Sequence, residues 1–150
     1  MNTKKKVMIA ATAVVLGLAV AVPGAVYANL QEEREQNMKN VVGAVKKLVP
    51  VFKGEVAFDG AMVAEQGMIA NENFVAASGK FPEGSVEGRA LPVIWERHME
   101  FEALFDDAIA ASAAIAAAGK ANDEEAFKAA FQQMGGTCKD CHETYRKPEN

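Results

Sequence analysis

The chain has 150 residues, half of them hydrophobic, and its 16 Lys and Arg against 20 Asp and Glu give a formal net charge of −4. The first 28 residues hold three lysines and no acid, so without them 122 residues remain with a charge of −7. This length supports one domain with a single core, and an acidic domain makes nucleic acid a poor partner.

The chain begins with the three parts of a secretory signal peptide. Three lysines between Met1 and Val7 form a basic start, sixteen uncharged residues follow, and Ala28 ends a small-residue exit. The alternative is a membrane anchor, but sixteen apolar residues fall short of the roughly 20 that span a bilayer. We therefore expect residues 1–28 to be a signal peptide and residues 29–150 to be a periplasmic domain without a membrane span.

The chain has two cysteines, and both belong to the motif Cys138-Lys139-Asp140-Cys141-His142. Cys-x-x-Cys-His is the attachment signal for c-type haem. Two thiols one helical turn apart can each form a thioether with one haem vinyl group, and the next histidine is placed to bind the iron. The sequence thus predicts one covalent haem c held by Cys138 and Cys141, with His142 as the proximal iron ligand.

Other uses of this motif fit the chain less well. A redox dithiol of the thioredoxin type usually lies near a βαβ pattern, which this alanine-rich sequence lacks. A zinc site needs more Cys or His ligands than the chain supplies, and we expect the other histidine, His98, to be no iron ligand. No nucleophile or acid–base constellation stands out beside the motif, so we do not expect an enzyme.

Four segments have helical periodicity and are bounded by helix breakers. The sequence predicts helices over residues 29–49, 54–78, 92–118 and from 122 or 123 through the haem motif. Pro50 is expected to end the first helix and Gly119 the third. Asn122 and Glu125 form a pattern like a capping box at the start of the fourth. No segment alternates like a strand, so we predict an all-α fold, an antiparallel up-down-up-down four-helix bundle.

Glycines lie inside two of the predicted helices. Gly60 and Gly67 fall in the second helix, where they weaken the helical prediction. Gly135 and Gly136 directly precede the haem motif, where they either weaken the helix or let a flat group lie against the backbone. The neighbouring haem motif favours the second interpretation.

Three motifs occur in order along residues 29–150. They are Arg34-x-x-x-Met38-Lys39-x-Val41, Leu91-Pro92-x-Ile94-Trp95 and Thr137-Cys138-Lys139-x-Cys141-His142-x-x-Tyr145-Arg146. With them, nearly the whole predicted domain resembles the class II cytochromes c, the family of cytochrome c prime and its low-spin relatives. Members of this family often dimerise through their first two helices, so the resemblance leaves a homodimer open.

The resemblance implies roles for two arginines near the haem. Arg34 matches a first-helix arginine that contacts a haem propionate in relatives, and a solvated surface charge is the alternative. Arg146 lies four residues after His142 on the same helix face and matches a basic residue near the proximal side of the haem. The alternative for Arg146 is a C-terminal charge favoured by the helix dipole.

Two functions remain open, and they differ in what binds the iron opposite His142. In one, a side chain fills that position and the protein carries single electrons between redox partners that the sequence does not identify. In the other, the iron is five-coordinate and the protein binds small gases such as nitric oxide, as cytochrome c prime does. Low-spin relatives carry methionine where high-spin members commonly carry leucine. Met38 occupies this position, so the resemblance favours electron transfer with Met38 as the distal ligand.

The expected levels of the two ligands along the bundle agree with this choice. Met38 lies nine residues, about 13 Å, from the start of the first helix, and His142 lies five residues, about 8 Å, from the end of the antiparallel fourth. Three other side chains pass the same test: Met68, Met99 and His98. The choice of Met38 therefore rests on Arg34, one turn earlier on the same face, and ordinary core packing is the alternative.

We predict that the mature protein begins at Asn29. Mass spectrometry of the purified protein should show the loss of residues 1–28 and the gain of one haem, because the leader has all three features that a signal peptidase requires. An intact Met1 in the membrane fraction would contradict this prediction.

Overall fold

The computed structural model describes residues 23–85 and 87–148. Most of the predicted leader lies outside them, so the leader and its cleavage remain predictions. The described residues form no strand and five helices: α1 (Pro23–Phe52), α2 (Gly60–Ser78), α3 (Val93–Glu96), α4 (His98–Ala121) and α5 (Glu124–Tyr145). None of these helices combines the length and apolar character needed to cross a membrane.

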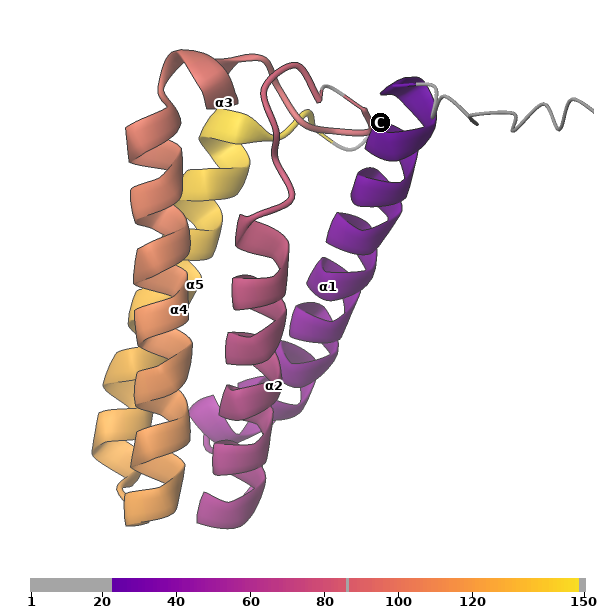
Figure 1. The fold of residues 1–150 in the computed structure, drawn as a ribbon. Coiled ribbons are helices and arrows are strands. Elements are labelled where there is room, and N and C mark those ends of the chain that lie inside the picture. The colour runs from indigo at the N-terminus through magenta and orange to yellow at the C-terminus, as the bar shows by residue number, and fades with distance from the viewer. Residues whose placement is uncertain (1–22, 86, 149–150) are drawn as a thin grey trace, which may run out of the picture.

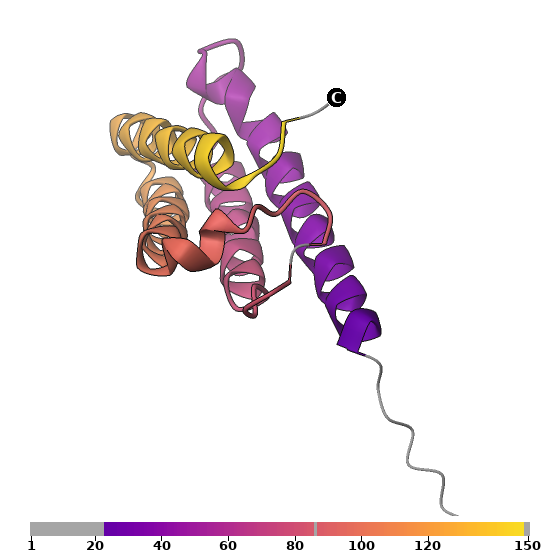
Figure 2. The same ribbon diagram turned by 90° about the horizontal axis from the view of Figure 1, so that it is seen from above.

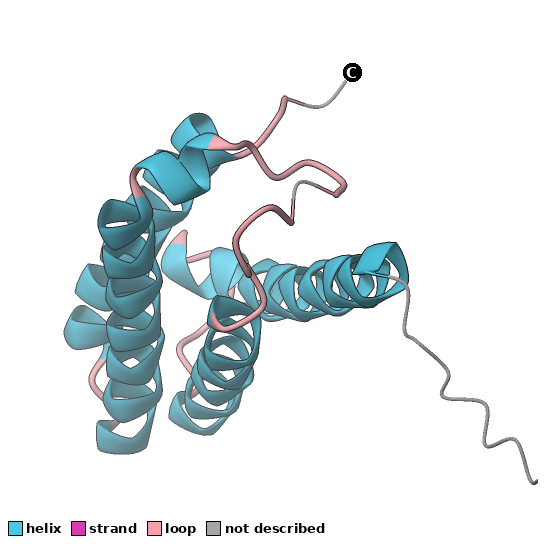
Figure 3. Cartoon of the chain, turned by 45° about the horizontal axis from the view of Figure 1, so that its top comes forward, coloured by secondary structure: helices cyan, strands magenta, loops and turns pink. Residues whose placement is uncertain are grey.

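The four long helices form an antiparallel bundle, which confirms the predicted fold. In Figure 1, α1 runs down, α2 up, α4 down and α5 up, and α3 lies across the upper end. α2 packs most extensively on α4, α4 packs on α5, and α1 packs on α2, whereas α1 and α5 touch little. Figures 2 and 3 show α1 inclined to the other helices. The ring of helices is therefore open between α1 and α5.

α1 buries one face because its apolar residues follow helical spacing. The buried residues recur at steps of three and four: Val41, Ala44, Leu48 and Val51. The predicted end at Pro50 is wrong, because the helix continues to Phe52 with Pro50 inside its last turn. Proline removes one backbone donor, and the contact of Phe52 with Phe131 of α5, at 5.0 Å between ring centroids, holds this turn in place.

α2 begins later than the periodicity predicts. Residues 53–59 form a turn, where Gly54 has φ of +71°, and Asp59 caps the helix by accepting from the backbone N–H groups of Ala61 and Met62. Val56 lies in this turn and is 54% exposed, although it falls inside the predicted helix over residues 54–78. The helix itself buries apolar residues at helical spacing: Val63, Ala70, Phe74 and Ala77.

The predicted third helix is two helices. The backbone leaves the helical region at Arg97, with φ of −124° and ψ of 44°, so α3 ends and α4 begins there. α4 continues past Gly119 to Ala121 and closes at Asn122, whose φ of 55° is left-handed. The predicted capping box is therefore wrong. Asn122 ends α4, and Asp123 caps α5 by accepting from the N–H of Ala126.

The interior glycines of α2 lie where its backbone meets that of α4. A Cβ on Gly67 would lie 2.5 Å from the backbone nitrogen of Ala116, and one on Gly119 would lie 2.3 Å from that of Ala64. Only glycine permits this approach. Gly135 and its neighbour Gly136 differ, because α5 runs through both without interruption and a Cβ on either would meet no protein atom within 4 Å. Both lie outside the lining of the cavity described below.

Replacing Gly67 with alanine should destabilise the protein by about 1–3 kcal/mol, because the new methyl group forces two helix backbones apart. Replacing Gly135 with alanine is the matched control, since this helical glycine faces open space. The control should stabilise the protein by about 0.5–1 kcal/mol through helix propensity. Urea unfolding of both purified variants measures the difference, and equal effects would contradict the close approach.

Candidate haem site

A cavity of about 820 Å³ lies on the open side of the bundle, between α1 and α5. This volume is within the range of about 300–1,000 Å³ usual for cofactor sites. The wall is mostly apolar and includes side chains from α1, α2 and α4: Val41, Val45, Phe74, Leu104, Phe105 and Ala108. The loop between α2 and α3 closes one edge with Phe81.

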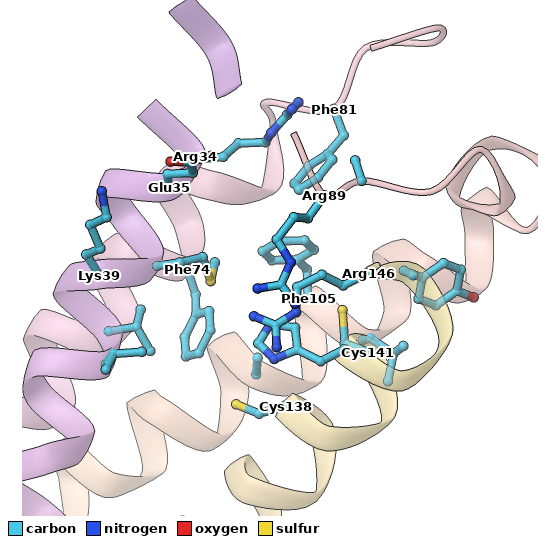
Figure 4. A pocket seen from close by; sticks show the side chains of 18 of the residues that line it. Arg34, Glu35, Lys39, Phe74, Phe81, Arg89, Phe105, Cys138, Cys141 and Arg146 are labelled. Atoms are coloured by element: carbon cyan, nitrogen blue, oxygen red, sulfur yellow. The ribbon is translucent and has the colours of Figure 1, made fainter. Parts of the chain in front are cut away.

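The three residues of the predicted attachment motif line this cavity together. Cys138 and Cys141 lie one turn apart on α5, so both thiols project from the same side of the helix, as Figure 4 shows, and His142 follows them. Both cysteines are partly buried and form no disulfide. α5 therefore presents two thiols and an imidazole to one side of the space where a flat group fits.

The environment of the thiols disfavours a redox dithiol. Burial raises the pKa of Cys138, and burial together with the neighbouring Cys138 raises the pKa of Cys141 to about 11. Catalytic dithiols depend on a lowered pKa, which produces the reactive thiolate. These cysteines are neutral thiols in an apolar wall, which suits two thioether bonds better than thiol exchange.

His142 is held in the form that binds iron. Burial lowers the pKa of its imidazole, and the positive charges of Arg146 and Arg89 lower it further. A neutral imidazole keeps a nitrogen lone pair that can be given to a metal. The local electrostatics therefore agree with the predicted role of His142.

Met38 lines the same cavity from the opposite wall. It lies on α1, is partly buried, and is the one methionine of the described residues in the lining. The competing side chains lie outside it. Met68 is 42% exposed, Met99 is 83% exposed, and His98 pairs with Glu102 at 3.3 Å on the surface of α4. Among the candidates for the distal ligand that the helix levels left open, the tertiary structure thus places only Met38 at the cavity.

Arg34 also lies at the cavity, and the alternative of a solvated surface charge is wrong. The residue is 6% exposed. Its Nη1 donates to the carbonyl oxygen of Lys80 at 2.7 Å and to Oγ of Ser85 at 3.3 Å. Its guanidinium carbon lies 4.7 Å from the ring centroid of Phe81. The propionate contact implied by the resemblance stays a prediction.

Two further arginines lie near His142, and the sequence pointed to only one of them. Arg146, at the end of α5, lines the cavity as expected. Arg89 lines it as well, and its Nε and Nη2 donate to the carbonyl oxygen of Lys147 at 2.9 and 2.6 Å. Figure 4 shows both arginine side chains reaching into the cavity. No local pattern marks Arg89, because its partner is 58 residues away in the chain.

Only some of the aromatic residues of the domain lie at the cavity. Phe101 and Tyr145 line the cavity. Phe127 and Phe131 are buried elsewhere in the core, where they pack on each other at 5.7 Å between ring centroids. Trp95 lies outside the lining and donates its indole N–H to the carbonyl oxygen of Phe81 at 3.3 Å.

The charge at the cavity fits a group with an apolar ring and a carboxylate edge. Five basic residues lie in the lining: Arg34, Lys39, Lys46, Arg89 and Arg146. Two acids accompany them, Glu35 and Glu87, although acids outnumber bases in the chain as a whole. An excess of cations beside an apolar wall suits the two propionates of a haem. The cavity and its three attachment residues therefore fit haem c.

A four-helix bundle with Cys-x-x-Cys-His at the end of its last helix defines a class of c-type cytochromes. The sequence profile of the family described as Cytochrome C' matches residues 29–146. The chain therefore belongs to the cytochrome c' family, and it carries one covalently bound haem c. The four-helix bundle described above is the fold of this family.

Individual relatives agree with the family assignment. The chain is 35% identical over 125 residues to cytochrome c-556 of Agrobacterium fabrum, covering 82% of this chain and 85% of that protein. It is 34% identical over 146 residues to cytochrome c' of Rhodopseudomonas palustris, covering 95% and 97%. The family, more than any single relative, fixes the identity of the cofactor.

Solved structures have the same fold. Cytochrome c' from Rubrivivax gelatinosus superposes with a TM-score of 0.75 at 26% identity, over 81% of this chain and 97% of that one. The nitric oxide complex of a leucine-to-alanine mutant of cytochrome c prime from Alcaligenes xylosoxidans gives a TM-score of 0.77 at 24% identity, covering 82% and 97%. The second likeness shows the fold alone.

Replacing both Cys138 and Cys141 with alanine should abolish covalent attachment of the haem and leave a poorly folded bundle, because the haem fills a space between α1 and α5. Acid–acetone extraction followed by a haem stain measures the attachment. Haem that stays with the chain in the double variant would contradict the assigned site. Replacing the exposed Lys139 with alanine is the control and should leave attachment intact.

Proposed function

We propose that this cytochrome binds a small gas molecule such as nitric oxide at a haem iron held on one side by His142. The family assignment carries this proposal. A protein named cytochrome c' is 34% identical to this chain over nearly its whole length, and a cytochrome c prime of the same fold has been solved as a nitric oxide complex. The proposal differs from the expectation at position 38, where the resemblance favoured permanent ligation by methionine.

The wall formed by α1 suits a small, weakly polar ligand. The lining of α1 includes the apolar side chains of Val41, Val42 and Val45, and Phe74 of α2 adds an aromatic surface. The same helix also brings Glu35, Lys39 and Lys46 to the lining, but its apolar side chains offer no hydrogen bonds to water or an anion, and a diatomic gas needs none. When bound, the haem would supply an iron that can take up a diatomic gas, and His142 would hold that iron.

The chain's own residues have separate tasks in this proposal. Cys138 and Cys141 would fix the cofactor to α5, and His142, kept neutral by its surroundings, would give its lone pair to the iron. The cationic edge with Arg89 and Arg146 offsets the propionate charge. The apolar residues of α1 keep competing polar ligands away.

A second candidate function is electron transfer with Met38 as the distal iron ligand. The observation that favours it is the place of Met38 in the cavity lining, on the wall opposite the helix that carries His142. A thioether bound to the iron would leave no free position for a gas, and the protein would pass single electrons between redox proteins. Both candidates suit a periplasmic protein, a location that we propose from the predicted leader.

An absorption spectrum of the ferrous protein, recorded with and without carbon monoxide, separates the two functions. We expect a five-coordinate, high-spin spectrum that changes on addition of carbon monoxide. The Met38→Ala variant should remain high-spin, and Met68→Ala, an exposed methionine outside the cavity, should behave as the wild type. A low-spin wild type that resists carbon monoxide, and that becomes high-spin in Met38→Ala, would instead support electron transfer.

A further inference from the structure

The wall that carries Met38 is held by few direct contacts with the helix that carries His142. α1 packs on α2 but touches α5 little. In Figures 1 and 2, the earlier part of α1 lies well apart from the remaining helices. The separation of the two walls therefore also depends on the other contacts of α1, and the side chain of Arg34 makes several of these.

Arg34 uses its planar fork to bind the loop between α2 and α3. Its Nη1 donates to the carbonyl oxygen of Lys80 and to Oγ of Ser85, and its Nη2 donates to the carbonyl oxygen of Glu87 at 3.4 Å. Ser85 is fully buried and Arg34 almost so. The Arg34 side chain thus joins α1 to three residues that lie 46 to 53 positions after Arg34 in the sequence. An ion pair between Glu33 and Lys80 lies beside this contact.

The loop between α2 and α3 contacts α4 through the ring of Phe81. The Arg34 guanidinium lies over the ring of Phe81 at 4.7 Å. That ring packs in turn on two rings of α4, Phe101 at 4.8 Å and Phe105 at 5.7 Å between centroids. Both α4 rings line the cavity, so the contacts of Arg34 continue along the cavity wall.

The same aromatic contacts reach α5. Phe101 packs edge-on against Tyr145 at 5.2 Å, and Tyr145 lies three residues after His142. The backbone N–H of Leu91 also donates to the carbonyl oxygen of Tyr145 at 3.1 Å. A continuous set of contacts therefore runs from Arg34 on one wall of the cavity to the haem-binding helix on the other.

We propose that Arg34 is a positioning residue that fastens α1 to Lys80, Ser85 and Glu87, and through Phe81 sets the distance between the walls that carry Met38 and His142. This role differs from pairing with a propionate, because it depends on the shape of the guanidinium as well as its charge. A lysine keeps the charge, but its ammonium group has neither the planar fork nor a flat face for the Phe81 ring. The proposal rests on the haem assignment and is independent of the choice between gas binding and Met38 ligation.

The rate of carbon monoxide association with the ferrous protein tests this role, because it reports the space at the iron. Arg34→Lys and Arg34→Gln should change the rate constant in the same direction, each by about threefold or more, since small displacements near a reacting centre have large effects on rates. Phe81→Leu should produce the same change. Adding Phe81→Leu to Arg34→Gln should change little more, because both act on one set of contacts.

A control variant and a mild variant complete the test. Asn40→Ala removes a 2.8 Å hydrogen bond between α1 and Asn73 of α2 but no loop contact, so its association rate should equal that of the wild type. Ser85→Ala deletes one acceptor of Arg34 and should shift the rate in the same direction by a smaller factor, which keeps the test usable if larger changes prevent folding.

The outcomes separate positioning from propionate pairing. If Arg34 acts by charge on a propionate, Arg34→Lys behaves as the wild type, and the effects of Arg34→Gln and Phe81→Leu on the rate constant multiply independently. Either result would overturn the proposal. Thermal unfolding supplies a second readout, in which Arg34→Lys should lower the Tm by about 3–6 °C through its lost hydrogen bonds. An unchanged Tm would also count against the proposed fastening.

Discussion

The backbone packing of α2 against α4 is the contact on which the rest of the bundle depends. Gly67 and Gly119 bring the two helices so close that a methyl group at either position would meet backbone atoms. This central pair fixes where the outer helices attach, since α1 packs on α2 and α5 packs on α4. The outer helices consequently face each other across a gap instead of meeting. The cavity is a result of this unequal packing.

The haem completes a core that the polypeptide leaves unfinished. The cavity walls between α1 and α5 expose apolar side chains that would otherwise meet water, and a bound ring removes that surface from solvent. Covalent attachment through Cys138 and Cys141, which we predict, would keep the ring at α5, while Arg34 ties α1 to the loop between α2 and α3. Cofactor binding and stability are therefore linked, because a group that binds only the folded chain stabilises it.

The sequence by itself determined the class of fold and the kind of cofactor, and it predicted the residues that attach this cofactor. Helical periodicity and the Cys138–Cys141–His142 spacing are local properties, since residues three or four apart share a helix face wherever the helix lies. Met38 was expected beside the haem because its motif resembles that of a known family, and it lines the cavity, whereas its binding to the iron stays a prediction. Several helix boundaries were predicted wrongly. Pro50 did not end α1, and the break at Arg97 had no signal in the apolar pattern.

Only the tertiary structure decided how distant segments meet. It placed Met68 and Met99 outside the cavity, although helix levels alone allowed them. The tertiary structure also brought Arg34 to Glu87 and Arg89 to Lys147, although more than fifty residues separate the members of each pair. Such pairs share no sequence spacing, and their hydrogen bonds form only after the helices have packed. Helical spacing therefore determines which face of a helix is buried, whereas the packing of α1, α4 and α5 determines what that face contacts.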